Sequence, residues 1–290
     1  MKTLILGSGF GLYGYLPAAY KISNKIFLQK KYKNFFYSRS ELKNFNNKII
    51  WYDNLKAIIN AIDIVIIAKR PIDQDIQIRK ILNFKNKIKH FFLEKPLSSN
   101  YKRSFLLEKK IRMKKKSFSI CFIFEYLSWY NEIKKIIKSN NNNIVINWLI
   151  KNKKKKNWKY QKKDGGGVIR FYGIHMIKLF SDLNFDKIVY NYFDKSHIKW
   201  ILKIKDKKNN LITLKINSLS NKDLFKIDNN EKKIVNYTNP FKYKIIPNKK
   251  DPRVKYLKKY LLFKLKNKNK NALQRFLNLW KNLEILKNKY

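Results

Sequence analysis

Cysteine is almost absent from this chain of 290 residues: Cys121 is the single one, so no disulfide can form within the chain. That is typical of a protein kept in a reducing compartment, and we expect a cytoplasmic location. The apolar neighbours Ile120 and Phe122 indicate a buried, structural thiol. The sequence also lacks any uncharged apolar run that approaches the roughly 20 residues needed to span a bilayer.

Acidic residues are scarce. Asp and Glu together number 19 against 67 Lys and Arg, and the formal net charge is +48 at pH 7. A codon bias toward A and T explains abundant Lys, Asn and Ile, but it does not explain few acids, whose codons are also A-rich. A field this positive attracts nucleic acids, anionic lipid surfaces and nucleotide-linked substrates. Because the lysines are spread along the chain, with clusters at 153–156 and 264–270, a solvated surface is favoured over a dedicated groove.

Hydrophobic residues make up 44% of the chain, and they include 6 Trp, 18 Tyr and 20 Phe. Such a composition can fill a substantial core, and the length suits either one large domain or two modest ones. A disordered chain is therefore excluded.

The most informative segment lies at the start, where the apolar run Leu4-Ile5-Leu6 ends in Gly7-Ser8-Gly9-Phe10-Gly11. This order predicts a strand, a glycine turn and the start of a helix. Gly7 permits the tight turn, and Gly9 lets a ligand approach the backbone without meeting a Cβ. The unpaired N–H groups of a helix start favour an anion, typically a dinucleotide pyrophosphate. The third glycine stands at 11, so the spacing departs from G-x-G-x-x-G, and other motifs have to support the interpretation.

Residues 1–124 alternate between short apolar runs and segments with helical spacing. After the opening strand and helix, we expect strands over 34–39, 62–68, 89–93 and 117–124, and helices over 53–61, 76–82 and 101–112. Such alternation predicts an α/β domain with a doubly wound parallel sheet, whose ligands bind at the carboxyl edge of the strands.

The pattern changes after residue 125. Alternation over 144–150, 188–193, 197–204, 211–216 and 224–227 predicts an open, mainly antiparallel sheet. Two helices are also expected, one that follows the glycines at 165–167 and carries His175, and one over 271–290 with an apolar face. We therefore predict a second domain of the α+β class over 125–290.

Three motifs stand in order along the chain: GSGFG followed by Leu16-Pro17-Ala18, then Glu94-Lys95-Pro96, then GGG followed by Gly173-Ile174-His175. Together they resemble the Gfo/Idh/MocA family, the glucose-fructose oxidoreductase and inositol dehydrogenase type of NAD(P)-dependent oxidoreductase, over nearly the whole chain. The resemblance implies a Rossmann domain at 1–124 and a substrate-binding domain at 125–290. It also implies that the second domain often forms the subunit interface, so we expect a dimer or tetramer.

The resemblance assigns cofactor-binding residues to three segments and places two basic residues at the substrate. Lys95 lies between nicotinamide and substrate in the family, and His175 faces the substrate; no metal site is predicted. The cofactor set is Gly7, Ser8, Gly9, Phe10 and Gly11 on the phosphate turn, Ala68, Lys69, Pro71 and Gln74 beside the nicotinamide ribose, and Glu94 with Lys95 on the EKP motif.

Lys95 and His175 are the candidate catalytic residues. Hydride transfer from a secondary alcohol needs a group that accepts the hydroxyl proton. A cationic nicotinamide disfavours the charged form of a nearby lysine, and imidazole titrates near neutrality. We assign proton transfer to His175 and polarisation of the substrate oxygen to Lys95, and the reverse assignment stays open. The candidate substrate-binding residues are Trp158, Arg170, Tyr172 and His175.

The cofactor preference depends on the tip of the expected second strand, where a dinucleotide fold reads the ribose. Ser38 and Arg39 stand there and can hydrogen-bond and pair with a 2′-phosphate, which favours NADP over NAD. Glu41 lies close by and weakens this preference, and stacking of Arg39 on adenine is the alternative.

One departure from the family pattern bears on activity. Members commonly carry an aspartate four residues before the histidine, and this chain has Phe171 there; Lys178 replaces the acid that often follows. The leading hypothesis is an oxidoreductase acting on a sugar, a nucleotide sugar or a polyol. The alternative is a catalytically impaired nucleotide-binding sensor, and the third is a basic binder of nucleic acids or anionic surfaces, although no specific nucleic-acid partner is expected.

Overall fold

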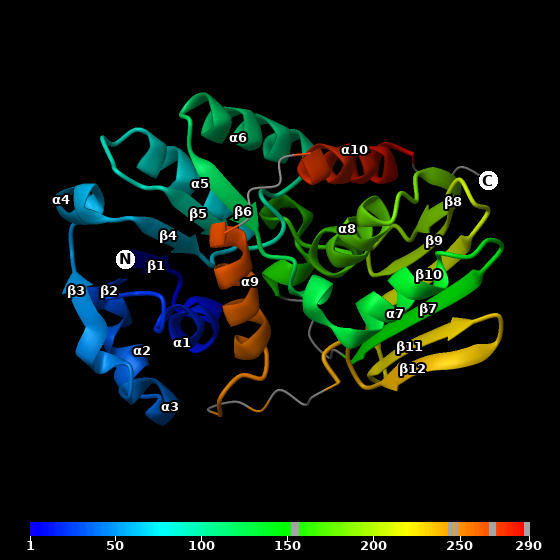
Figure 1. Cartoon of the computed structure of the whole chain (residues 1–290), viewed down its shortest axis with the longest axis horizontal. Coiled ribbons are helices and arrows are strands. Elements are labelled where there is room, and N and C mark those ends of the chain that lie inside the picture. The colour runs from blue at the N-terminus through cyan, green and yellow to red at the C-terminus, as the bar shows by residue number, and fades with distance from the viewer. Residues whose placement is uncertain (152–156, 243–245, 247–248, 267–270, 287–290) are drawn as a thin grey trace. The chain divides into compact units, whose positions relative to one another are not determined.

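The computed structural model describes residues 1–151, 157–242, 246, 249–266 and 271–286. Two compact units make up the chain (Figure 1). The first unit comprises Met1–Ser98, Arg103–Ile123 and Ile245–Lys268, and the second comprises Ser99–Lys102, Phe124–Lys244 and Asn269–Tyr290. The main division falls at residues 123 and 124. The segment 245–268, which we expected in the second domain, groups with the first unit.

The first unit is built on a six-stranded parallel sheet with the order β3-β2-β1-β4-β5-β6. β1 lies between β2 and β4, so the winding direction reverses beside it, and parallel sheets bind ligands at such a switch point. β4 is buried along its whole length, as expected for a β-branched run covered on both faces. The strands are β1 (Lys2–Leu6), β2 (Lys25–Gln29), β3 (Ile49–Tyr52), β4 (Ile64–Ile67), β5 (His90–Leu93) and β6 (Ser117–Ile120).

Helices connect the parallel strands, and a further one comes from far along the chain. α5 begins at Pro71, where a missing N–H costs nothing because the first turn has no acceptor for it. α9 belongs to the late segment and contacts α1 of the first unit (Figure 1). The helices are α1 (Leu16–Ala19), α2 (Lys33–Tyr37), α3 (Ser40–Lys43), α4 (Leu55–Ile58), α5 (Pro71–Leu82), α6 (Tyr101–Met113) and α9 (Val254–Lys266).

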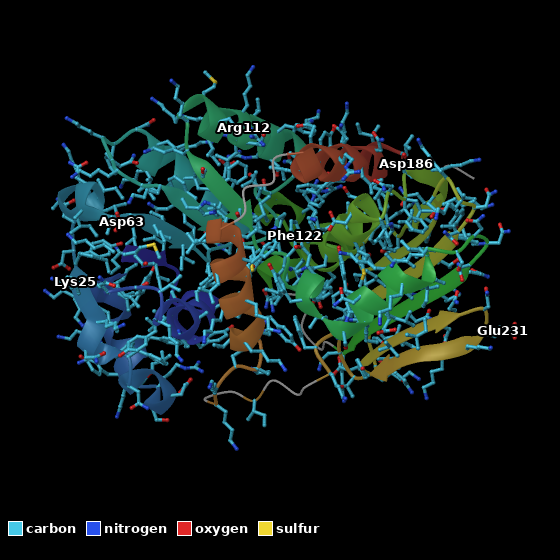
Figure 2. The ribbon with its side chains drawn as sticks, viewed as in Figure 1. Lys25, Asp63, Arg112, Phe122, Asp186 and Glu231 are labelled. Atoms are coloured by element: carbon cyan, nitrogen blue, oxygen red, sulfur yellow. The ribbon has the colours of Figure 1, made fainter. Side chains whose placement is uncertain are left out.

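Asp63 ties three strands together at the amino edge of this sheet. Its carboxylate accepts a 2.9 Å hydrogen bond from the Lys2 N–H, and its own N–H donates to the Lys2 carbonyl at 2.9 Å. The Asp63 carbonyl accepts from the Lys89 N–H at 2.8 Å. Figure 2 labels Asp63 and also Lys25, the first residue of β2. The amino edge is thus closed by main-chain bonds, and the glycine turn lies at the opposite edge.

The structure corrects one expected strand. Residues 33–37 form α2, and Ser38 is its C-cap residue. The second strand is Lys25–Gln29. The run Phe35-Phe36-Tyr37 carries strand-forming residue types, but burial here has helical spacing: Tyr32 and Phe36, four residues apart, are buried, and the three residues between them are exposed. Ser38 and Arg39 therefore do not stand at a strand tip. Gln29 ends the strand, and Lys30 and Lys31 follow it.

The second unit is built on a mixed six-stranded sheet with the order β12-β11-β7-β10-β9-β8. β7 and β10 pair in parallel, and the other neighbours are antiparallel, which confirms a mainly antiparallel sheet. β12 was not expected from the sequence. The strands are β7 (Asn143–Lys151), β8 (Lys187–Phe193), β9 (Lys199–Lys205), β10 (Leu211–Ser220), β11 (Leu224–Asn229) and β12 (Lys232–Tyr237).

The two faces of this sheet differ in chemistry. Trp200 and Leu202 of β9 and Leu214 of β10 are fully buried on the inner face. Lys203 and Lys215 alternate with them and are exposed on the other face. Alternation of this kind fixes the register, because a slip of one residue would exchange the faces.

Three helices complete the described part of the second unit: α7 (Ser128–Ile136), α8 (Ile174–Asp182) and α10 (Asn271–Ile285). α8 and α10 contact each other (Figure 1). Trp280 of α10 is fully buried, which confirms the expected apolar face. The chain reaches α8 through Gly165 and Gly167, whose φ angles of 88° and 95° favour glycine. Residues 153–156 and part of 264–270, the two lysine clusters, lie outside the described residues.

Candidate functional site

The glycine turn follows β1 directly, as expected. Gly7 has a φ of 134°, and a Cβ there would lie 2.3 Å from the Ala68 carbonyl oxygen, so only glycine fits. The Gly9 carbonyl accepts from the N–H groups of Leu12 at 2.9 Å and Tyr13 at 3.2 Å, and this starts the helical segment that leads into α1. A Cβ at Gly9 would meet no atom within 4 Å. The turn is therefore closed on the side of Gly7 and open at Gly9.

Aromatic rings and two arginines surround this turn. The Phe10 ring packs edge-on against Tyr13 at 5.6 Å and Tyr15 at 5.4 Å. The Arg39 guanidinium lies 5.1 Å from the centre of the Tyr13 ring, and that of Arg253 lies 4.3 Å from the centre of the Phe10 ring. Arg253 was missed by sequence reasoning, because no motif links a residue of the late segment to the first strand.

Ser38 and Arg39 make contacts with their own neighbours. The Ser38 hydroxyl donates to the Phe35 carbonyl at 2.9 Å, and Arg39 Nε donates to Glu41 Oε1 at 2.6 Å. Arg39 therefore reaches the glycine turn through its stacking on Tyr13 and not from the end of a strand. Cofactor binding by Ser38 and Arg39 stays a prediction.

Lysines lie at the carboxyl ends of two strands that flank β1. Lys31 follows β2, and Lys69 follows β4. Burial lowers the pKa of the Lys69 ammonium, and the positive charge of Lys31 lowers it further. Lys69 Nζ donates to Gln77 Oε1 at 3.1 Å. Two cations that interact electrostatically thus lie at the edge of the sheet where the glycine turn lies.

Gln74 holds the backbone of the EKP motif. Its amide donates to the carbonyls of Glu94 at 2.7 Å, Pro96 at 3.2 Å and Leu97 at 3.1 Å, and its Oε1 accepts from the Glu94 N–H at 2.9 Å. The side chain is fully buried. Gln74, which we expected beside the nicotinamide ribose, thus fixes the loop that carries Lys95, and Lys95 itself is half-buried at the carboxyl edge of β5.

Glu94 carries a perturbed carboxyl group. Burial raises its pKa, although the Tyr15 hydroxyl, Lys95 and Arg253 each act in the opposite direction. The Tyr15 hydroxyl donates to Glu94 Oε1 at 2.6 Å. Burial also raises the pKa of Tyr15 well above its ordinary value, so this phenol stays a hydrogen-bond donor at neutral pH.

His175 occupies the first turn of α8 in the second unit. The side chain is buried at 6% exposure, and its ring stacks on Phe124 with centroids 4.0 Å apart and planes 7° apart. The next residue, Glu125, pairs with Lys178 at 3.1 Å, and Lys178 also bonds Asp182 at 2.5 Å. The stacking on Phe124 and the ion pair with Glu125 join α8 to these two residues, so the ring of His175 is held in one orientation.

Phe171, at the position of the family's usual aspartate, lies among aromatic rings. The ring of Trp158 is 5.3 Å away and that of Tyr172 is 4.8 Å away, and Tyr172 in turn packs edge-on against Trp148 at 5.6 Å. The Lys159 ammonium lies 5.1 Å from the centre of the Phe171 ring. No aspartate therefore stands four residues before His175, and an aromatic cluster occupies its place.

Arg170 is bound to the C-terminal helix. Its Nε donates to Glu284 Oε1 at 2.6 Å, its Nη2 to Oε2 at 2.9 Å, and its Nη1 to the Lys162 carbonyl at 2.8 Å. Arg170 also lines a pocket of about 190 Å³ together with Gly167 and His197. Of the predicted substrate residues, Trp158 and Tyr172 flank Phe171, while Arg170 serves the contact with α10.

Known proteins resemble this chain in fold but not in sequence. No family model matches the chain, and no curated protein matches its sequence. The WlbA (WbpB) dehydrogenase from Thermus thermophilus, in complex with NAD and UDP-GlcNAcA, matches with a TM-score of 0.72 and 11% identity, covering 100% of this chain and 96% of that chain. The fold is that of the Gfo/Idh/MocA-type dehydrogenases.

Two further solved structures have a similar fold. A myo-inositol dehydrogenase from Corynebacterium glutamicum has a TM-score of 0.67 and 12% identity, covering 98% of this chain and 96% of that one. A 3-ketoreductase from Actinomadura kijaniata, in complex with NADP and TDP-benzene, has a TM-score of 0.68 and 10% identity, covering 99% of this chain and 98% of that one. The neighbours thus include proteins that bind NAD and proteins that bind NADP. In the described part of the chain no helix is long and apolar enough to cross a membrane.

The Glu94 carboxyl predicts a pH dependence of stability. Because its pKa is raised in the folded protein, the folded state binds the proton more tightly than the unfolded chain. The free energy of unfolding should therefore fall as the pH rises from the ordinary value of 4.5 through the raised pKa. Glu94→Gln should remove this slope, measured by thermal melts between pH 4.5 and 8. Asp53→Asn removes an exposed carboxylate of the same unit and serves as the control; an equal change of slope in both variants would contradict the assignment.

Proposed function

We propose that the protein is an NAD(P)-dependent oxidoreductase that acts on a secondary alcohol or ketone of a sugar, a nucleotide sugar or a polyol. The observation that carries the proposal is the glycine turn at the switch point of the parallel sheet, closed at Gly7 and open at Gly9. A dinucleotide diphosphate fits such a cradle, because it can approach backbone N–H groups where no side chain intervenes. The nicotinamide, when bound, accepts or donates the hydride.

In this proposal, Lys95 and His175 handle the hydroxyl group and its proton. Lys95 follows β5 at the carboxyl edge, where the hydrogen bonds of Gln74 hold its loop. His175 is buried, and its ring is oriented by Phe124. His175 takes the hydroxyl proton as the hydride leaves, and Lys95 polarises the substrate oxygen. Burial of His175 favours the directed transfer of a proton over its loss to water.

Lys31 and Lys69 support a preference for NADP. Ser38 and Arg39, on which we expected this preference to depend, do not lie at a strand tip. The positive charge of Lys31 lowers the pKa of Lys69, and an anion bound beside the two lysines would offset this repulsion. The 2′-phosphate of NADP is such an anion, and the residues after the second strand are the ones that read this ribose. Arg39, stacked on Tyr13, suits the adenine side of the same nucleotide.

The second candidate is a nucleotide-binding protein with impaired catalysis. Phe171 favours it, because the aromatic cluster with Trp158 and Tyr172 replaces the family's aspartate and offers no carboxylate to a proton relay. Both candidates bind the dinucleotide, and turnover distinguishes them.

A pair of glycine variants tests the cradle. Gly7→Ala should lower stability by about 1–3 kcal/mol, because its Cβ would meet the Ala68 carbonyl and its φ is strained. Gly9→Ala should leave the melting temperature almost unchanged and weaken NADPH binding at least tenfold. Thermal melts and NADPH fluorescence titrations measure the two effects. Unchanged NADPH affinity in a folded Gly9→Ala protein would contradict a phosphate at this turn.

Loss of the proton-handling groups should lower turnover. His175→Gln should reduce kcat/KM for a responsive sugar by roughly 10²-fold or more, the range expected for a general base, while NADPH still binds. His90→Asn is the control, since His90 is also a buried histidine but lies at the amino end of β5 and contacts Ser119 at 3.0 Å. A panel of sugars, nucleotide sugars and polyols measures the rates. NADPH binding without turnover on any member of the panel would favour the second candidate.

The cofactor preference should reside in Lys31. Lys31→Glu should weaken NADPH binding at least tenfold and leave NADH binding within about threefold, because only NADPH carries the 2′-phosphate. Lys25→Glu makes the same change of charge at the other end of β2 and should affect neither cofactor. Equal weakening of NADPH and NADH by Lys31→Glu would show a general charge effect and exclude a 2′-phosphate site.

A further inference from the structure

Arg253 joins the late segment of the chain to the glycine turn. It stands immediately before α9, within the segment 245–268 that belongs to the first unit. Its guanidinium lies 4.3 Å from the centre of the Phe10 ring, and Phe10 is the residue between Gly9 and Gly11. A cation is therefore placed beside the turn by a residue more than 240 positions further along the chain.

Asp251 fixes the orientation of this guanidinium. The carboxylate of Asp251 is buried and accepts from Arg253 Nε at 2.9 Å and from Nη2 at 2.6 Å. It also accepts from the Arg253 main-chain N–H at 2.8 Å. A guanidinium bound through two nitrogens has a fixed plane, so its remaining N–H groups have fixed directions.

The start of α9 gains nothing from a positive charge. Cations are unfavourable at a helix N-terminus, where the helix dipole is itself positive. The Asp251 carboxylate already bonds the backbone at this point, which is what a helix start requires. The arginine therefore opposes the local preference of the helix, and its place is better explained by the turn that it faces.

Arg39 repeats the arrangement on the neighbouring ring. It stacks on Tyr13, and its partner Glu41 is two residues away, as Asp251 is from Arg253. The rings of Phe10 and Tyr13 contact each other at 5.6 Å. Two arginines held by acids thus flank the residues that follow Gly9, and an anion bound to the turn would meet positive charge from both.

We propose that Arg253 binds the diphosphate of the dinucleotide, as a phosphate-binding residue supplied by the late segment. This inference rests on the proposed function, because it requires that a dinucleotide occupy the glycine turn. The guanidinium fork suits phosphate oxygens, and the ring of Phe10 supports its plane. Binding of the dinucleotide would then couple the segment 245–268 to the first strand of the sheet.

The test compares Arg253→Met with Arg112→Met. Arg112, labelled on α6 in Figure 2, is an arginine of the same unit that pairs with Glu108 and lies 5.9 Å from the Phe118 ring, so the control loses the same kinds of contact. NADPH and ADP-ribose, which share the diphosphate, are titrated against the full chain. We expect Arg253→Met to weaken both ligands at least tenfold, Arg253→Lys to weaken them less, and Arg112→Met to leave both within about twofold.

Further measurements distinguish a loss of folding in Arg253→Met from an incorrect role assigned to Arg253. If Arg253→Met has a lowered melting temperature, the double variant Asp251→Asn/Arg253→Met is titrated in its place. The double variant leaves no unpaired carboxylate at position 251. Equal affinity of wild type and variant for both ligands would overturn the inference and leave the proposed function intact, as would weakening of NADPH alone. If the wild type binds neither ligand, the proposed function fails and the inference fails with it.

Discussion

The close approach of Gly7 to the Ala68 carbonyl is the constraint on which the first unit depends. β1 and β4 end side by side, and the chain leaves β1 at the point where any side chain would collide with the end of β4. Because Gly7 alone satisfies this geometry, the turn that follows has one path, and Gly9 comes to stand in open space. The placement of Phe10, and through it of Arg253, follows from the same path.

Much of the fold could be predicted because local patterns and tertiary environment agree. The β-branched run of β4 is covered on both faces, the alternating run of β9 has one buried face, and the glycines at 165–167 precede the helix of His175. In each case the residue types required by the local conformation are also those required by burial. The order of the three motifs then indicated the fold at a level where overall sequence identity does not.

The rest could not be predicted because distant contacts decide it. Phe35-Phe36-Tyr37 has the composition of a strand, but a short true strand at Lys25–Gln29 already pairs with β1 and leaves the aromatic run to a helix. We consequently expected the tip of that strand at Ser38 and Arg39 and missed Lys31, which follows the true tip. α9 and Arg253 join the first unit from the far end of the chain, and no spacing in the sequence records such a return.

The outward face of the second sheet has a consequence for assembly. Lys203 and Lys215 point away from the buried face, and Lys226 of β11 lies beyond them across β7. A twofold pair formed through this face would set each of these ammonium groups against the same surface of its copy. Exposed lysines would then repel their counterparts, so an association through this face would strengthen as added salt screens the charges.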